Sequence, residues 1–113
     1  MSYAVPGAPK PVLQIRDVVR ATAQAYRVHP SKLMVRRRFR DIVRPRQVAM
    51  YLAATDTHHS LHTIAQQFGG FDHTTVIYAR DLIHDKIEKG DGDVINAVAF
   101  IRDLYPPECK SEV

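Results

Sequence analysis

Apolar side chains recur at helical spacing along most of this chain, whereas no stretch alternates apolar and polar residues over a length that would form a strand. A period near 3.6 residues is typical of helices that bury one face. The pattern therefore predicts an all-α fold. The predicted helices cover about residues 12–27, 30–34, 44–55, 61–68, 72–89 and 94–104.

Two of these boundaries depend on proline. Pro30 or Ser31 is expected to begin the short second helix, because proline disfavours helical backbone in the residue before it. Residues 35–43, rich in arginine, are predicted to form a loop with at most one helical turn. Pro45 then falls in the first turn of the next helix, where a missing N–H removes no hydrogen bond.

The middle of the chain carries the most informative pattern. Ser60 is the predicted N-cap of a short helix that Gly69 and Gly70 end, and Asp72 is the predicted N-cap of the next helix. Two helices joined by a tight glycine turn match the helix-turn-helix pattern. A helix that enters the DNA major groove contacts bases through its N-terminal residues. The polar residues 72–75 are therefore candidates to read bases.

Length and composition indicate one domain. With 113 residues, of which 45% are apolar and 25% charged, the chain can bury a single core. Residues 1–11 are expected to be a disordered leader, residues 12–105 the domain and residues 106–113 a flexible tail. No apolar run approaches the roughly 20 residues of a membrane span, and the first residues do not form a secretory signal. These features predict a cytoplasmic protein with no membrane partner.

Charge is distributed unevenly along the chain. Residues 1–80 hold 12 Lys or Arg against 4 Asp or Glu, whereas residues 81–113 hold 4 against 8. Within the basic part, arginines are concentrated in residues 36–46, a density typical of proteins that neutralise phosphates. The alternative is a solvated surface loop, which would more commonly mix Lys with Glu. Arginine also suits bidentate contacts with phosphates and bases.

The residues give little support to an enzyme or a metalloprotein. The single cysteine, Cys109, cannot form an internal disulfide and lies in a proline-rich tail. His58 and His62 are four residues apart, but no cysteine joins them and a four-ligand pattern is missing. The chain also has no Gly-x-x-x-x-Gly-Lys-Ser/Thr loop for nucleotide phosphates. We therefore expect no enzyme activity, metal, cofactor or nucleotide.

Two longer motifs resemble those of a known family. They are RPRQVAMYL at residues 44–52 and FGGFDHTTV at residues 68–76, with SLxxIA at residues 60–65 between them. All three are similar to the C-terminal DNA-binding domain (domain IV) of the bacterial replication initiator DnaA, and the resemblance extends over about residues 12–104. It implies a six-helix, Trp-repressor-like bundle that contains the helix-turn-helix. It also implies monomeric binding to a short asymmetric DNA site, the DnaA box.

The resemblance assigns roles to individual residues. It implies that the start of the recognition helix enters the major groove, with base contacts from Asp72, His73, Thr74 and Thr75. It implies that Arg38 of the basic loop reaches into the adjacent minor groove. Contacts with the DNA backbone are expected from Arg36, Arg37, Arg40, Arg44, Arg46, Gln47, Leu61 and His62.

The chemistry of these residues agrees with such roles but leaves alternatives open. Threonine can present a methyl group to thymine, aspartate can accept from a cytosine amino group, and histidine can bond a purine edge. An arginine is drawn to a narrow minor groove by its negative potential. The alternatives are that Asp72 only caps its helix, that His73 is an ordinary surface residue, and that Thr75 bonds back to the backbone.

One main hypothesis and one alternative follow. As a stand-alone protein without the initiator's ATPase module, the chain is expected to bind double-stranded DNA at DnaA-box-like sites in the nucleoid, and so regulate replication initiation or transcription. The alternative is a protein-interaction regulator that binds the replication initiator or its regulators, with weak or nonspecific DNA binding. Two features motivate the alternative: the acidic residues 81–113, and Phe71, which stands where the family commonly has a basic residue.

Overall fold

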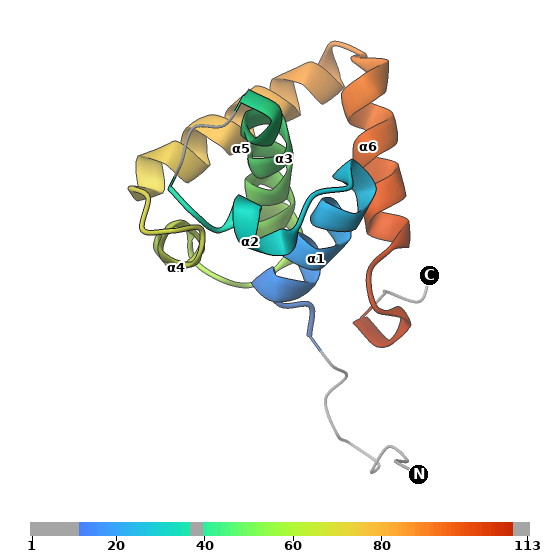
Figure 1. The fold of residues 1–113 in the computed structure, drawn as a ribbon. Coiled ribbons are helices and arrows are strands. Elements are labelled where there is room, and N and C mark those ends of the chain that lie inside the picture. The colour runs from blue at the N-terminus through green and yellow to red at the C-terminus, as the bar shows by residue number, and fades with distance from the viewer. Residues whose placement is uncertain (1–11, 37–39, 110–113) are drawn as a thin grey trace, which may run out of the picture.

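The computed structural model describes residues 12–36 and 40–109, and every regular element within these ranges is helical (Figure 1). The all-α prediction is therefore confirmed. The predictions for residues 1–11, for Arg37 and Arg38, and for residues 110–113 lie outside the described residues. The elements are α1 (Ile15–Tyr26), α2 (Pro30–Leu33), α3 (Arg40–Asp56), α4 (Leu61–Gln67), α5 (His73–Glu88), α6 (Gly92–Asp103) and a short 3-10 turn, η1 (Pro107–Cys109).

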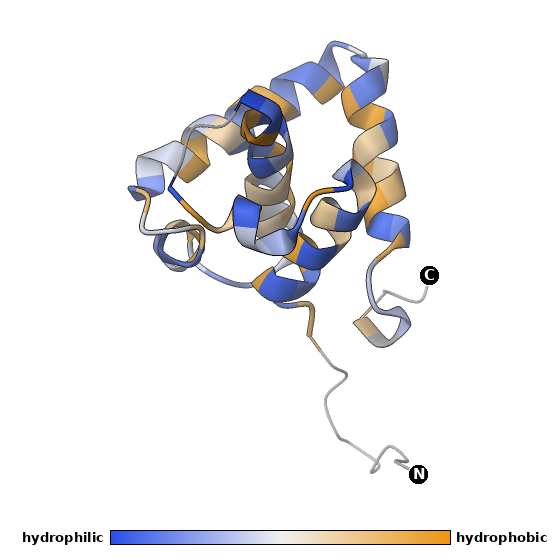
Figure 2. Ribbon diagram, viewed as in Figure 1, coloured by the Kyte–Doolittle hydropathy of each residue, from blue (hydrophilic) through white to orange (hydrophobic). Residues whose placement is uncertain are grey.

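Helix α3 is the centre of the fold. It packs against α5 and α1. Helix α4 packs against α5, and α6 packs against both α1 and α5 (Figure 1). Hydrophobic residues recur turn by turn along the helices (Figure 2), as expected when each buries one face. In the described chain no helix has both the length and the apolar character required to cross a bilayer. Every α-helix contributes a fully buried side chain to the one core, for example Val18, Leu33, Leu52, Ile64, Ile83 and Ile101.

The first helix begins at Ile15, three residues later than predicted. The backbone N–H of Gln14 donates to the Asp17 carboxylate at 2.9 Å, which closes the start of the helix. Val12 lies outside the helix and is 50% exposed. The apolar periodicity placed Val12 on the inner face, but a local hydrogen bond between side chain and backbone decided the boundary.

The third helix begins at Arg40, about one turn earlier than the predicted start at Arg44, so the single helical turn allowed within residues 35–43 is continuous with this helix. Pro45 lies inside the helix rather than at its start. A proline there removes one intrahelical hydrogen bond and crowds the carbonyl four residues earlier. Ile42 is fully buried in the core, and Pro45 is buried as well. The apolar surface that this extra turn buries offsets the lost hydrogen bond.

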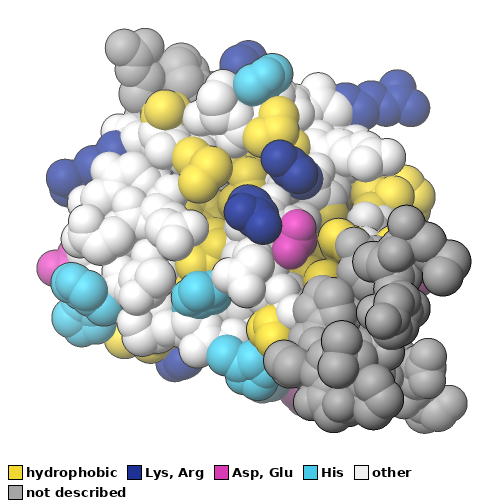
Figure 3. Space-filling view, turned by 90° about the horizontal axis from the view of Figure 1, so that it is seen from below, with side chains coloured by type: hydrophobic (Ala, Val, Ile, Leu, Met, Phe, Trp, Pro, Cys, Tyr) yellow, Lys and Arg dark blue, Asp and Glu magenta, His cyan; other side chains and the backbone are white. Residues whose placement is uncertain are grey.

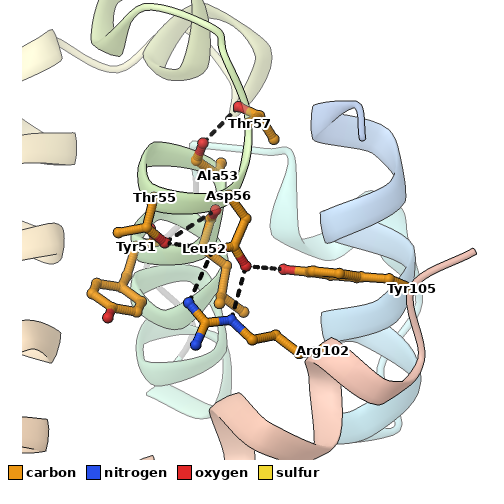
Figure 4. Close-up of polar contacts among 8 residues, drawn as sticks. All are labelled: Tyr51, Leu52, Ala53, Thr55, Asp56, Thr57, Arg102 and Tyr105. Atoms are coloured by element: carbon orange, nitrogen blue, oxygen red, sulfur yellow. Dashed lines mark hydrogen bonds and ion pairs between the residues drawn. The ribbon is translucent and has the colours of Figure 1, made fainter. Parts of the chain in front are cut away.

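A polar cluster fastens α6 to the end of α3 (Figure 4). Arg102 donates to both oxygens of Asp56, at 3.0 Å and 2.9 Å, and the Tyr105 hydroxyl donates to the same carboxylate at 2.8 Å. Burial, followed by the negative charge of Asp56, raises the pKa of Tyr105 far above its usual value. The contacts span more than 40 residues of sequence, and so they hold the C-terminal helix against the middle of the chain.

Candidate nucleic-acid interface

Helices α4 and α5 form the helix-turn-helix that the sequence predicted. Ser60 caps α4 by accepting from the Thr63 N–H at 3.1 Å, as expected. Gly69 and Gly70 follow with φ of 105° and 82°, values that favour glycine because it lacks a Cβ. The Phe71 N–H then donates to the carbonyl of Ala65 at 3.0 Å and closes the turn. Helix α5 is held to the core by its buried side chains, Val76, Ala79 and Ile83.

Asp72 caps α5, and its carboxylate also fixes the first polar side chains of that helix. One oxygen, Oδ1, accepts from the Thr74 N–H at 2.9 Å and from the Thr74 hydroxyl at 3.0 Å. These two hydrogen bonds from Thr74, more than the nearby His73, lower the pKa of Asp72. The hydroxyl of Thr74 therefore uses its hydrogen internally, while its methyl group and oxygen lone pairs stay available to a ligand.

The polar start of α5 is open to solvent. Asp72 and His73 have side chains that are 68% and 53% exposed, and Thr74 is exposed as well. Thr75 is half-buried, and within the described residues its hydroxyl makes no hydrogen bond, which removes the expected alternative of bonding to its own backbone. The predicted base-reading residues thus lie together on an accessible helix end.

The basic stretch lies directly against the glycine turn. A Cβ added to Gly69 would lie 2.9 Å from the Arg36 nitrogen and 3.0 Å from the Met34 carbonyl oxygen. This close approach places Arg36 beside the start of α5, where it lines a polar hollow with His62, Asp72 and His73. The sequence offered no reason to expect residue 36 next to residue 69, because their contact is a packing of backbone against backbone between segments far apart in the chain. Arg37 and Arg38, the latter assigned to the minor groove, are outside the described residues.

Arg46, for which a phosphate contact is predicted, is largely buried in the structure. It is only 6% exposed, and its guanidinium donates to the backbone carbonyls of Lys32, Leu33 and Val35 at 3.5, 3.4 and 2.7 Å. Burial lowers its pKa. Arg46 therefore supports the basic stretch from inside the protein, while its contact with the DNA backbone stays a prediction.

Arg44 is also placed away from the helix-turn-helix. It lines a hollow between the end of α1 and the start of α6 with Tyr26, Asp91 and Asp93. Among the described residues, its Nη1 atom is buried and has no hydrogen-bond partner. Arg44 and Arg46 both belong to α3 but have different surroundings, and the contact of Arg44 with the DNA backbone stays a prediction.

The remaining predicted backbone contacts have mixed surroundings. Arg40 and His62 are exposed, while Gln47 and Leu61 are half-buried. Gln47 lines a second hollow of about 570 Å³ between α3 and α5, together with Arg36, Phe71, Thr75 and Tyr78.

Two aromatic residues of this hollow were not expected to take part. Tyr78, 64% exposed, lies one helical turn after Thr75, a spacing that places both on the same side of α5. For Phe71, the sequence predicted only the loss of a contact that a basic residue makes at this position in the family. The Arg46 and Arg36 guanidinium carbons lie over its ring, at 5.3 Å and 5.8 Å from the centroid.

Figure 3 shows histidine side chains at several separate places on one face of the molecule. His59 Nε2 bonds to Gln14 Oε1 at 2.9 Å, which ties the loop before α4 to the start of α1. No group of three or more His, Cys, Asp or Glu side chains in the described part of the chain could hold a metal ion.

A short helix, a glycine turn and a second helix with an exposed polar start define a helix-turn-helix domain of the DNA-binding class. The family profile described as "Bacterial dnaA protein helix-turn-helix" matches residues 15–83. The chain belongs to this family.

Several proteins are similar to this chain over most of its length. One is the "Chromosomal replication initiator protein DnaA" of Rhodopseudomonas palustris (strain TIE-1), which is 48% identical over 84 residues, or 74% of this chain and 18% of the relative. The protein of the same name from Mesorhizobium japonicum is 43% identical over 98 residues, or 87% of this chain and 20% of the relative. The one from Nitrobacter hamburgensis is 48% identical over 77 residues, or 68% of this chain and 16% of the relative. The chain thus spans about a fifth of the length of the relatives that it matches.

Proposed function

We propose that this chain binds double-stranded DNA at DnaA-box-like sites and thereby regulates replication initiation or transcription. The observation that carries the proposal is the exposed, polar start of α5 with Arg36 packed beside it through Gly69. One surface thereby combines groups able to read base edges with a cation able to bind phosphate.

The first residues of α5 are proposed to read the major groove. Thr74 would offer its methyl group to a thymine and its oxygen to a base donor, because its hydroxyl hydrogen already bonds to Asp72. His73 would bond a purine edge. Thr75 and Tyr78 line the neighbouring hollow, which would accommodate the adjoining backbone.

Basic residues are proposed to fix the position of the protein on the duplex. Arg36, Arg40 and His62 are exposed and would contact phosphates, which supplies affinity without reading sequence. The minor-groove role of Arg38 remains part of this proposal on the family resemblance. The proposed regulation would act through occupancy of the DNA site.

The proposal is tested by fluorescence anisotropy of a labelled duplex with a DnaA box against a scrambled duplex of equal composition. We expect a preference of a hundredfold or more for the box, which approaches the usual ratio of specific to nonspecific binding of about 10³ to 10⁷. If about six phosphates are neutralised, log affinity should fall with log salt at a slope near −5. Equal affinity for both duplexes would refute site-specific binding.

Two variants distinguish residues that read the bases from residues that bind the DNA backbone. Thr74→Ala should weaken binding to the box but not to the scrambled duplex, whereas Arg40→Ala should weaken both alike. Lys89→Ala is the charge-matched control. Lys89 follows the far end of α5, about 24 Å along the helix from its start, and should affect neither.

A second candidate is favoured by the surface of α6. This helix lies beyond the residues that the family profile matches, carries the acidic Asp93 in its first turn, and exposes Phe100 and Ile95, at 55% and 38%. The alternative function is binding to the replication initiator or its regulators through this acidic half. Co-precipitation with purified initiator, lost in Phe100→Ser but kept in Thr74→Ala, would favour it.

A further inference from the structure

We infer that Phe71 is a positioning residue that holds the Arg36 guanidinium at the start of the recognition helix, ready to bind DNA. The inference rests on the proposed DNA binding and concerns how this chain achieves it without a basic residue at position 71. In the sequence Phe71 reads as a missing charge. In the structure the Phe71 ring is the group that the Arg36 guanidinium contacts.

Arg36 has one contact that fixes its side chain. Its guanidinium carbon lies 5.8 Å from the centroid of the Phe71 ring, within the range of a cation–π interaction. Elsewhere in the described chain its side chain has no ion pair and no hydrogen bond. Arg36 is also exposed, and it lines both hollows that flank the start of α5.

This kind of contact leaves the cation able to bind a ligand. An arginine held by a carboxylate uses N–H donors on that partner, and the negative charge of the carboxylate offsets its positive charge. An arginine that lies over an aromatic ring keeps all five N–H donors and its positive charge. The ring restricts the side chain beforehand, so less conformational entropy is lost when DNA binds.

The ring is itself held in place. Phe71 is half-buried against the core, and its N–H donates to the Ala65 carbonyl at 3.0 Å. Arg46 lies over the same ring at 5.3 Å and is fixed by the carbonyls of α2 and the following residues. A buried arginine thus supports the ring, and the ring supports an exposed arginine.

The first test is a double-mutant cycle on box-duplex affinity in the full chain. Phe71→Leu keeps an apolar side chain against the core but removes the ring. It should weaken binding about threefold, Arg36→Ala about tenfold, and the double variant no more than Arg36→Ala alone. Phe71→Tyr keeps the ring and should bind within about twofold of the parent.

Additive losses in the double variant, or an unchanged affinity in Phe71→Leu, would overturn the inference. Thermal unfolding of each variant is measured alongside, and Phe71→Leu and Phe71→Tyr should unfold at similar temperatures. A purely structural role for Phe71 would make the affinity loss follow the loss of stability and would not distinguish leucine from tyrosine.

The second test needs no DNA and separates this inference from the proposed function. In the free protein, the side-chain protons of Arg36 should show an upfield ring-current shift by NMR, which Phe71→Leu abolishes and Phe71→Tyr retains. Its absence in the parent would overturn the positioning role. Its presence together with equal binding to box and scrambled duplexes would support the positioning and refute only the site-specific function.

Discussion

Arg36 and Arg46 lie over the same aromatic ring but have opposite surroundings. Arg36 is exposed, while Arg46 is buried and donates to backbone carbonyls. In the sequence they differ little, since both belong to one cluster of arginines. At the scale of single residues, the backbone around each side chain decides whether its charge supports the fold or faces a partner.

This difference predicts opposite phenotypes for two similar substitutions. Arg46→Ala should lower the free energy of unfolding by about 2–4 kcal/mol, because it leaves buried carbonyls without a donor. Arg36→Ala should change it by less than about 0.5 kcal/mol, as for an ordinary surface position. Chemical denaturation of both variants measures this. A marginal loss in Arg46→Ala would mean that its hydrogen bonds do not hold the basic stretch.

Asp72 allows capping to be separated from base reading. Serine also caps helices well but is shorter and uncharged, so Asp72→Ser should preserve the melting temperature. We expect the preference for the box duplex to fall about threefold to tenfold, because Oδ2 makes no hydrogen bond in the described residues and is free to accept from a base. Unchanged discrimination in this variant would leave Asp72 as a cap alone.

The lowered pKa of Asp72 determines in which direction its contribution to stability changes with pH. A carboxylate whose pKa is depressed by folding stabilises the protein above its unfolded pKa, and this stabilisation is lost as the pH falls through the folded value. The cap of α5 should therefore persist at any pH suited to DNA binding.

At the scale of elements, the decisive contact is between the basic stretch and the glycine turn. Gly69 provides the positive φ that ends α4 and the space that the backbone of residues 34–36 occupies. One residue thus shapes the helix-turn-helix and brings the arginine stretch to it. Gly70 supplies only a positive φ, since a Cβ there would meet nothing within 4 Å.

The two glycines form a matched pair of substitutions. Gly70→Ala should cost about 1–2 kcal/mol of stability, the usual penalty for a left-handed backbone in a residue with a Cβ. Gly69→Ala should cost clearly more, because the new Cβ would also press on the backbone at Arg36. Thermal unfolding gives the comparison, and equal losses would show that the loop yields without strain.

At the scale of the whole molecule, two regions with different chemistry are joined through α3. The start of α5 and the basic stretch form the candidate DNA surface, whereas the acidic C-terminal part is fastened by Asp56, Arg102 and Tyr105. Both regions rest on one core to which all six α-helices contribute, and this core holds the proposed DNA surface in place.

The Tyr105 hydroxyl gives this arrangement a pH signature. Folding raises its pKa, so its contribution is complete below the unfolded value near 10 and is lost as the pH rises toward the folded value. Tyr105→Phe should cost about 1–2 kcal/mol at neutral pH through the lost hydrogen bond. The two stability curves, measured by chemical denaturation, should converge above about pH 10.

Convergence is the critical observation. Tyr26, whose pKa is also raised by burial, remains in both proteins and contributes the same slope to each. Parallel curves throughout the alkaline range would mean that Tyr105 ionises as freely in the folded protein as in the unfolded one.

The sequence by itself determined the helical fold, the caps at Ser60 and Asp72, and the glycine turn between them. These features follow from local hydrogen bonding and apolar spacing, which act over a few residues and can be read along the chain.

Only the tertiary structure decided the fate of the arginines. Arg36 reaches the recognition helix because its backbone packs against Gly69. Arg46 is buried and Arg44 faces α6 because α3 turns these two side chains to different sides. Packing between distant segments also converted Phe71 from a missing charge into a support for Arg36. Such contacts depend on the positions of whole helices, which no local pattern specifies.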